Sequence, residues 1–138
     1  MQKTKLIIDT NIWVSYFMGK NIRVHLDKII ADQRFDFFIS QNAIDELQQV
    51  LNRSKFQKYI TPAQIESLMV LLLQRCILVN VTTFVNISRD PKDDFLLALS
   101  TTCQADYLLT GDEDLLVLQK IETTTIIKMA DFNNFFYP

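Results

Sequence analysis

The chain has 138 residues, of which 49% are hydrophobic and 22% are charged. This balance is ordinary for a globular protein, and the length suffices for a substantial core, so we expect a single domain over residues 1–138. Two glycines and three prolines leave no room for a flexible linker or a low-complexity segment. The net charge of −2 gives no global attraction to nucleic acid, so any such contact needs a local basic patch.

Neither the cysteines nor the apolar runs point to secretion or to a membrane. Cys76 and Cys103 lack the spacing of a zinc or redox motif, and two reduced, buried thiols are the simplest interpretation. The apolar run at 6–8 is too short for a signal peptide, and the run at 68–73 is too short to cross a bilayer. We therefore predict a cytoplasmic protein that does not associate with a membrane.

The first predicted element is a strand at residues 6–8, Leu-Ile-Ile, which ends abruptly at Asp9. An unbroken apolar run of this kind is typical of a strand buried on both faces of a parallel sheet. Thr10 and Asn11 are common N-cap residues, so a helix is predicted directly after the strand. Further strands are expected at 35–39, 77–81, 107–109 and 123–127. Helices are expected at 12–17, 22–31, 62–75 and 92–103. Two more helices are expected, one capped by Ser40 and a short final one capped by Asp131. This alternation predicts an α/β fold with a parallel sheet, and the strand order stays open.

Four acids occupy comparable positions in this pattern. Asp9 and Asp112 each follow a strand. Glu46 and Asp94 lie near the starts of the helices that follow the second and third strands. Strand ends and the following helix starts lie at one edge of a parallel sheet, where ligands bind, so we expect these side chains to meet in one pocket. Asp94 or Asp112 alone is better explained as a helix cap or a surface acid, whereas Asp9 is the exception, because an apolar strand that ends in Asp-Thr-Asn is unusual. Four acids at one edge together favour a shared site.

A pocket of four ionised carboxylates is unfavourable when empty, because like charges disfavour each other's ionised forms. A divalent cation relieves this conflict. Carboxylate and water ligands, without thiolates or imidazoles, suit Mg²⁺ or Mn²⁺. Such an ion can activate a water and stabilise displacement at phosphorus, so metal-assisted phosphodiester hydrolysis is the reaction that these residues favour.

Taken together and in order, these segments resemble the PIN domain. The matching motifs are LIIDTN at 6–11, AIDEL at 43–47, DPKDDFLLA at 90–98 and LTGDED at 109–114. The resemblance covers nearly the whole chain and is greatest with the VapC-like toxins of bacterial toxin–antitoxin pairs. It implies a three-layer α/β/α fold with a mostly parallel central sheet of four to five strands. It also implies a metal-dependent endoribonuclease that uses Mg²⁺ or Mn²⁺, with RNA, a cognate antitoxin and a second copy of the chain as partners.

The resemblance further assigns roles to individual residues. The catalytic, metal-binding carboxylates are expected to be Asp9, Glu46, Asp94 and Asp112. The residues that support them are expected to be Thr10, Asn11, Thr110 and Asp114.

Asp93 and Asp94 are neighbours, and only one can point squarely into the pocket, because successive helix residues are about 100° apart. Asp94 shares a helix face with Ala98, whose small side chain allows the helix to approach the sheet closely. The spacing from Asp94 to Ala98 also matches the third acidic motif of the family. We therefore predict Asp94 as the ligand, and Asp93 as a first-turn acid stabilised by the helix N-terminus.

Phosphate binding by a chain of this net charge needs local cations. Arg89 and Lys92 flank the third acidic motif, and we predict that they contact RNA. A second basic group, for which a solvated face is an equally good interpretation, consists of Arg53, Lys55 and Lys58. In the helix at 62–75, apolar residues cover more than one core-facing stripe, which favours a homodimer.

Two other interpretations stay open. A receiver-like signalling domain also has an acidic pocket in an α/β fold, and Thr110 and Lys128 fit it superficially. However, its phospho-acceptor aspartate would follow the third strand, where this chain has Asn80. The second alternative is a degenerate PIN domain that acts only as a binding module.

Overall fold

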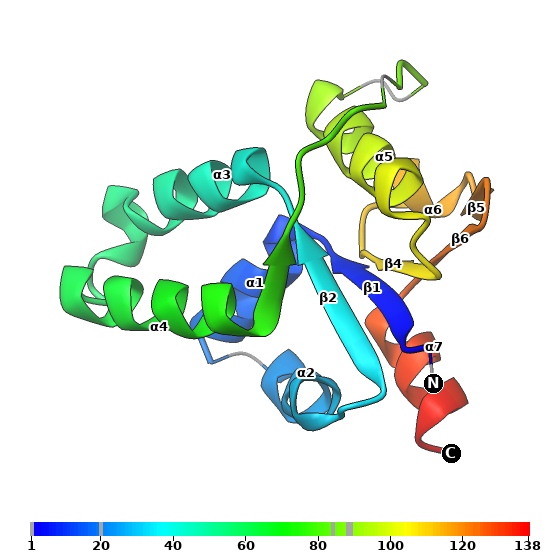
Figure 1. Ribbon diagram of the computed structural model, residues 1–138. Helices are drawn as coiled ribbons and strands as arrows, with labels where there is room; N and C mark the ends of the chain where they lie inside the picture. Colours follow the sequence, from blue (N-terminus) through cyan, green and yellow to red (C-terminus); the bar gives the residue numbers. More distant parts are fainter. Residues whose placement is uncertain (1, 20, 84, 88–89) are drawn as a thin grey trace.

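A central six-stranded sheet organises the chain in the computed structural model, which describes residues 2–19, 21–83, 85–87 and 90–138 (Figure 1). The strands are β1 (Thr4–Ile8), β2 (Phe35–Ile39), β3 (Cys76–Leu78), β4 (Tyr107–Leu109), β5 (Lys120–Ile121) and β6 (Thr124–Ile127). The helices are α1 (Thr10–Phe17), α2 (Ile22–Ala31), α3 (Gln41–Leu51), α4 (Pro62–Arg75), α5 (Pro91–Cys103), α6 (Glu113–Leu116) and α7 (Met129–Phe136). Within the described ranges, every helix falls short of the length and apolar character that crossing a membrane requires.

The strands follow the order β3-β2-β1-β4-β6-β5, and β1 pairs in parallel with both β2 and β4. Ile8 at the end of β1 is paired with Leu109, which is paired in turn with Ile127 at the end of β6. This register aligns the carboxyl ends of the central strands, so Asp9 and Thr110 leave the sheet side by side. The order also excludes a receiver-like domain, whose sheet runs 2-1-3-4-5.

Helices cover both faces of the sheet, which confirms the predicted three-layer α/β/α architecture. Leu6 and Ile8 belong to a core shared with α1, α2, α3, α4 and α7, whereas Ile7 belongs to a second core shared with α5 and α6. The first core is the larger, and its fully buried side chains include Phe35 and Phe37 of β2. In Figure 1, α5 lies on the opposite side of the sheet from α1 and α2. The buried sheet is therefore a rigid base for whatever follows its strand ends.

Most helix starts are set by local signals, as predicted. Ser40 caps α3 through its side chain, and Thr61 forms a capping box at the start of α4. Pro91 is the first residue of α5, where a missing backbone N–H has no cost. The start of α7 differs from the prediction. It begins at Met129, so Asp131 lies in its first turn and does not cap it.

The sheet has six strands, which exceeds the predicted four to five. The additional strand, β5, pairs antiparallel with β6 across a turn in which Glu122 has a positive φ of 50°. A two-residue strand is too short to show alternation in the sequence. β3 also ends at Leu78, earlier than the predicted residue 81.

Candidate active site

Asp9 lies where β1 ends and α1 begins, and both oxygens of its carboxylate accept hydrogen bonds. Oδ1 accepts one from the backbone N–H of Asn11 at 3.1 Å, which caps α1, and Oδ2 accepts one from the Thr110 hydroxyl at 2.7 Å. Thr110 is fully buried directly after β4, and its Oγ1 also accepts a bond from the backbone N–H of Asp112 at 3.1 Å. A single hydroxyl therefore links two of the predicted site acids.

Asp112 and Asp93 approach Asp9 from the next two elements. Asp112 caps α6, and its Oδ1 accepts a hydrogen bond from the backbone N–H of Asp114 at 2.9 Å. Asp93 is buried in the first turn of α5. Carboxylate oxygens of Asp93, Asp112 and Asp114 all lie within 4.8 Å of one another. Opposite ligands of Mg²⁺ are about 4.2 Å apart, given metal–oxygen distances of about 2.1 Å, so small side-chain movements would bring these oxygens onto one ion.

Asp9, Asp93 and Asp112 line a cavity of about 260 Å³ between α1, α3 and α5. Its lining contains five carboxylates, from Asp9, Glu46, Asp90, Asp93 and Asp112. Of the residues predicted to support the site, Thr10 and Asn11 line the cavity, whereas Asp114 lies beside Asp112 outside it. The structure thus brings together three of the four predicted catalytic carboxylates, which are Asp9, Glu46 and Asp112.

The fourth predicted carboxylate, Asp94, is not part of this lining, and Asp93 takes its place. Asp93 is 6% exposed and faces the cavity. Asp94 points toward the segment that precedes α5, where its Oδ1 accepts a hydrogen bond from the backbone N–H of Ile87 at 3.0 Å. The described side chains thus place Asp93, and not the expected Asp94, among the cavity acids, because α5 is rotated by about one residue from the expected orientation.

Burial and mutual repulsion disfavour the ionised forms of the cavity acids. The pKa of Asp93 is raised to about 7, first by burial and then by the hydrogen bond and charge of Asp112. Burial also raises the pKa of Asp9, against the lowering effect of the Thr110 hydrogen bond. Burial raises the pKa of Glu46 as well, and the charge of Lys92 opposes that rise. A bound cation would reverse all three shifts, so the donor set fits a divalent metal ion.

Comparison with known proteins agrees with this geometry. A family profile described as PIN domain matches residues 5–114, a range that contains every carboxylate of the cavity. The chain belongs to the PIN-domain family. The uncharacterized protein MJ1680 of Methanocaldococcus jannaschii is 24% identical to it over 119 residues, which are 85% of this chain and 76% of that protein. A chain in the crystal structure of VapBC2 from Rickettsia felis bound to a DNA fragment from their promoter matches the fold with a TM-score of 0.64. That match has 15% identity and covers 91% of this chain and 98% of the other.

Asp90 and Asp93 are the two cavity acids of this PIN domain that the sequence analysis did not select. Asp90 is the N-cap of α5, and its Oδ1 accepts a hydrogen bond from the backbone N–H of Lys92 at 3.0 Å. The sequence did contain a signal for Asp90, because this residue immediately precedes a proline that opens a helix. A helix start after a strand lies at the same edge of the sheet as the other acids.

Basic side chains border the acids of the PIN domain. Lys92 Nζ lies 3.9 Å from Glu46 Oε1, so this ion pair spans the cavity from α5 to α3. Arg53 and Lys55, which follow α3, line the same cavity. Lys58 is not among the lining residues, and Arg89 falls outside the described residues. Three of the five predicted RNA-contacting residues therefore adjoin the acids.

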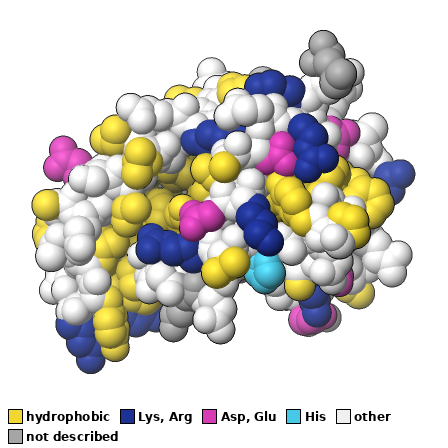
Figure 2. Space-filling view, turned by 90° about the horizontal axis from the view of Figure 1, so that it is seen from below, with side chains coloured by type: hydrophobic (Ala, Val, Ile, Leu, Met, Phe, Trp, Pro, Cys, Tyr) yellow, Lys and Arg dark blue, Asp and Glu magenta, His cyan; other side chains and the backbone are white. Residues whose placement is uncertain are grey.

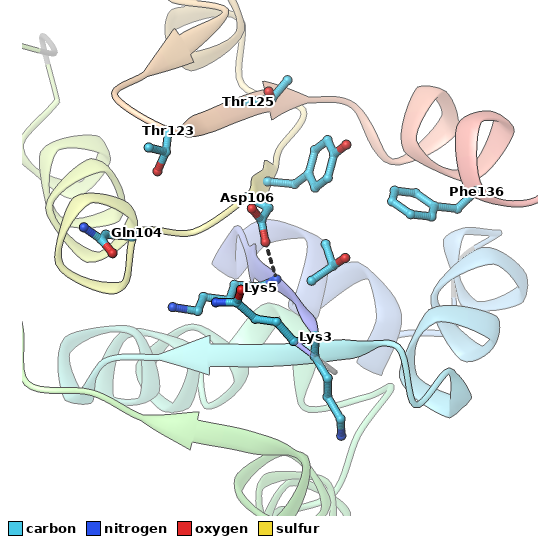
Figure 3. A pocket seen from close by; sticks show the side chains of 10 residues that line it. Lys3, Lys5, Gln104, Asp106, Thr123, Thr125 and Phe136 are labelled. Atoms are coloured by element: carbon cyan, nitrogen blue, oxygen red, sulfur yellow. Dashed lines mark hydrogen bonds between the residues drawn. The ribbon is translucent and has the colours of Figure 1, made fainter.

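A larger cavity, of about 600 Å³, lies at the opposite edge of the sheet (Figure 3). Two lysines border it, but other groups already engage their charges. Lys3 Nζ is 3.8 Å from Asp36 Oδ1, and Lys5 Nζ donates to the carbonyl oxygen of Cys103 at 3.2 Å. Of the described residues in its lining, Asp106 is the one carboxylate, and it accepts a hydrogen bond from the Lys5 backbone N–H at 2.8 Å. This edge of the PIN domain thus lacks the acid cluster.

Proposed function

We propose that this PIN-domain protein is a metal-dependent endoribonuclease that hydrolyses RNA phosphodiester bonds. The observation that carries the proposal is the gathering of five carboxylates and three basic side chains around one cavity at the carboxyl edge of the sheet. Carboxylates that disfavour each other's ionisation favour a divalent cation, here Mg²⁺ or Mn²⁺. Adjacent cationic side chains favour a phosphate. The acids of the cavity therefore suit the metal ion, and its basic side chains suit the RNA backbone.

Asp93 and Asp112, together with Asp9 in the same cavity and Asp114 beside Asp112, are the residues that would hold the ion. When bound, a divalent cation supplies Lewis-acid stabilisation of charge on the phosphate and lowers the pKa of a water. Thr110 keeps Asp9 and the backbone of Asp112 in a fixed relation through its two hydrogen bonds. Glu46 faces the cavity from α3, a position from which its carboxylate would accept a proton from the attacking water as the ester oxygen leaves.

The RNA backbone would reach the acids along the basic wall of the cavity. We assign the nearest phosphate contact to Lys92, because its ammonium already lies across the cavity beside Glu46. Arg53 and Lys55, which follow α3, line the same cavity and extend the contact beyond the end of that helix. Lys58 and Arg89 stay candidates on their positions in the sequence, close to these residues.

The proposed biological role is the toxin of a toxin–antitoxin pair, with an apolar surface for its protein partners. On α4, Val70 is 49% exposed and Leu71 is 61% exposed. Figure 2 shows hydrophobic side chains at the surface on its left part, the side on which α4 lies in Figure 1. An adjoining groove of about 350 Å³ is lined by side chains of α1, α2 and α4, with Trp13 at its base. From the likeness to the VapC-type chain of the Rickettsia complex, we propose a second copy of this chain and a cognate antitoxin as partners.

The test of the proposed activity is RNA cleavage by the purified chain. It should cut a labelled RNA in Mg²⁺ or Mn²⁺, and EDTA should stop the reaction. The matched control is Asp9→Asn, which keeps the size of the side chain and removes its charge. Cleavage that continues unchanged in EDTA, or in the Asp9→Asn variant, refutes the mechanism. A wild-type chain that cuts no RNA with Mg²⁺ and none with Mn²⁺ supports the alternative of a degenerate PIN domain that acts only as a binding module.

A further inference from the structure

A second cavity of about 260 Å³ continues from the acidic one along the groove between α3 and α5. The two cavities have a common wall, because Glu46, Arg53 and Lys92 line both. A chain whose phosphate lies beside Lys92 would therefore place a neighbouring nucleotide in this second cavity.

One face of α3 forms one side of the second cavity. Asn42, Glu46 and Gln49 are four and three residues apart, so they lie on the same helix face. The apolar residues of α3, which include Ile44 and Leu47, are buried on its other side. The two exposed amides each offer a donor and an acceptor, which is the chemistry that reads the edge of a nucleobase.

The opposite side of the cavity presents an aromatic ring. Phe95 of α5 lies three residues after Lys92 and is 51% exposed although it lines the cavity. A half-exposed phenyl ring beside a phosphate-binding cation is the arrangement on which single-stranded bases stack. Base-paired nucleotides cannot use it, because their faces are stacked and their edges are paired.

We propose that the groove between α3 and α5 is a nucleobase subsite, in which an unpaired base next to the cut phosphate stacks on Phe95 and meets the amides of Asn42 and Gln49. The proposal rests on the proposed ribonuclease function and adds to it a contact for an unpaired base of the RNA. It also makes Phe95 a binding residue and the two amides determinants of base preference.

The test uses the full chain with Asp9→Asn, in Mg²⁺, and a short single-stranded RNA that carries 2-aminopurine. Stacking should quench the fluorescence of the base, and Phe95→Ala should abolish the quenching and weaken binding by roughly tenfold. Phe95→Trp should restore both. Phe135→Ala is the matched control, because Phe135 is 69% exposed on α7 and does not line the groove.

The possible results separate this proposal from the proposed catalytic function. Quenching that depends on Phe95 supports the subsite even if the wild-type chain cuts no RNA. Cleavage by the wild-type chain combined with unchanged quenching and affinity in Phe95→Ala overturns the subsite alone, and leaves the groove to a protein partner. Equal affinity for the same sequence as a duplex, or no RNA binding at all, also overturns it.

Discussion

The proposed chemistry depends on which of two adjacent aspartates faces the acidic cavity. Asp93 is buried there, while Asp94 accepts a hydrogen bond from the backbone of Ile87 at 3.0 Å. Neighbouring residues of a helix point about 100° apart, so the two carboxylates cannot exchange roles unless α5 rotates. The pair provides a matched test, because the same charge is removed at adjacent positions of one helix turn, of which only Asp93 is buried against the cavity.

Asp93→Asn should lower the rate of RNA cleavage by about 100-fold or more, because it removes a charged ligand at the metal site. Asp94→Asn should keep most of the activity and cost little stability. Both rates are measured in Mg²⁺ with circular dichroism as a check on folding. An active Asp93→Asn variant together with an inactive Asp94→Asn variant would show that the rotation of α5 described above is wrong.

The raised pKa of Asp93 predicts how stability depends on pH when no metal is bound. Its pKa is about 7 in the folded chain, against about 3.9 for an unfolded aspartate. Between these values the folded state holds a proton that the unfolded state has lost, so the free energy of unfolding falls as pH rises from 4 to 7. Urea unfolding in EDTA should therefore show a lower stability at pH 7.5 than at pH 5.

Asp93→Asn should remove a large part of this pH dependence. Mg²⁺ should stabilise the wild-type chain more at pH 7.5 than at pH 5, since protons and metal compete for the same oxygens. Identical pH profiles for wild type and Asp93→Asn would contradict the assignment of the buried charge to Asp93.

At the scale of elements, Arg75 joins the end of α4 to α2 and β2. Its guanidinium donates hydrogen bonds to the carbonyl oxygens of Ile30 at 2.8 Å, Asp32 at 3.1 Å and Phe35 at 3.0 Å. It also lies over the ring of Phe37, with 4.5 Å between its central carbon and the ring centroid. One side chain thus ties the end of α4, directly before β3, to α2 and β2.

Arg75→Ala should lower the free energy of unfolding by roughly 2–3 kcal/mol, because it leaves carbonyl oxygens without a charged donor. Arg23→Ala is the matched control, since Arg23 is exposed and a surface substitution of this kind changes stability by less than about 0.5 kcal/mol. Denaturant unfolding measures both changes. Equal losses in the two variants would contradict the role given to Arg75.

Elements with local start signals were predictable from the sequence. The cap at Ser40, the Thr61–Pro62 pair and the proline that opens α5 each specify a helix start without tertiary information. The strand β5 was not predictable, because its two residues acquire their conformation only by pairing with β6.

The same distinction holds within the site. Asp9 was predictable because it directly follows an apolar strand, and Asp112 because it comes three residues after one. Asp93 was not, because Leu96, Leu97, Ala98 and Leu99 of α5 are all buried and define no single core-facing stripe. The rotation of α5 is set by packing on the sheet, which the spacing of apolar residues could not show.

At the scale of the whole molecule, the exposed apolar side chains of α4 predict self-association. Leu71→Glu should convert a dimer to a monomer, because a charge replaces a side chain that is 61% exposed on the proposed contact surface. The control is Val117→Glu, since Val117 is 74% exposed beyond the end of α6. Light scattering at high micromolar concentration measures the mass. A monomeric wild-type chain would contradict the dimer, and dissociation by both variants would contradict its placement on α4.

The central claim is that the carboxyl edge of the sheet holds a divalent metal ion. The most direct measurement is the anomalous diffraction of crystals grown or soaked with Mn²⁺, because it locates the ion without relying on activity. We predict an anomalous peak in the cavity of about 260 Å³, within bonding distance of Asp9, Asp93 or Asp112 oxygens. The same peak should be absent from crystals of Asp93→Asn. Two results with wild-type crystals at saturating Mn²⁺ would contradict the claim. One is an empty cavity, and the other is an ion bound at Asp94.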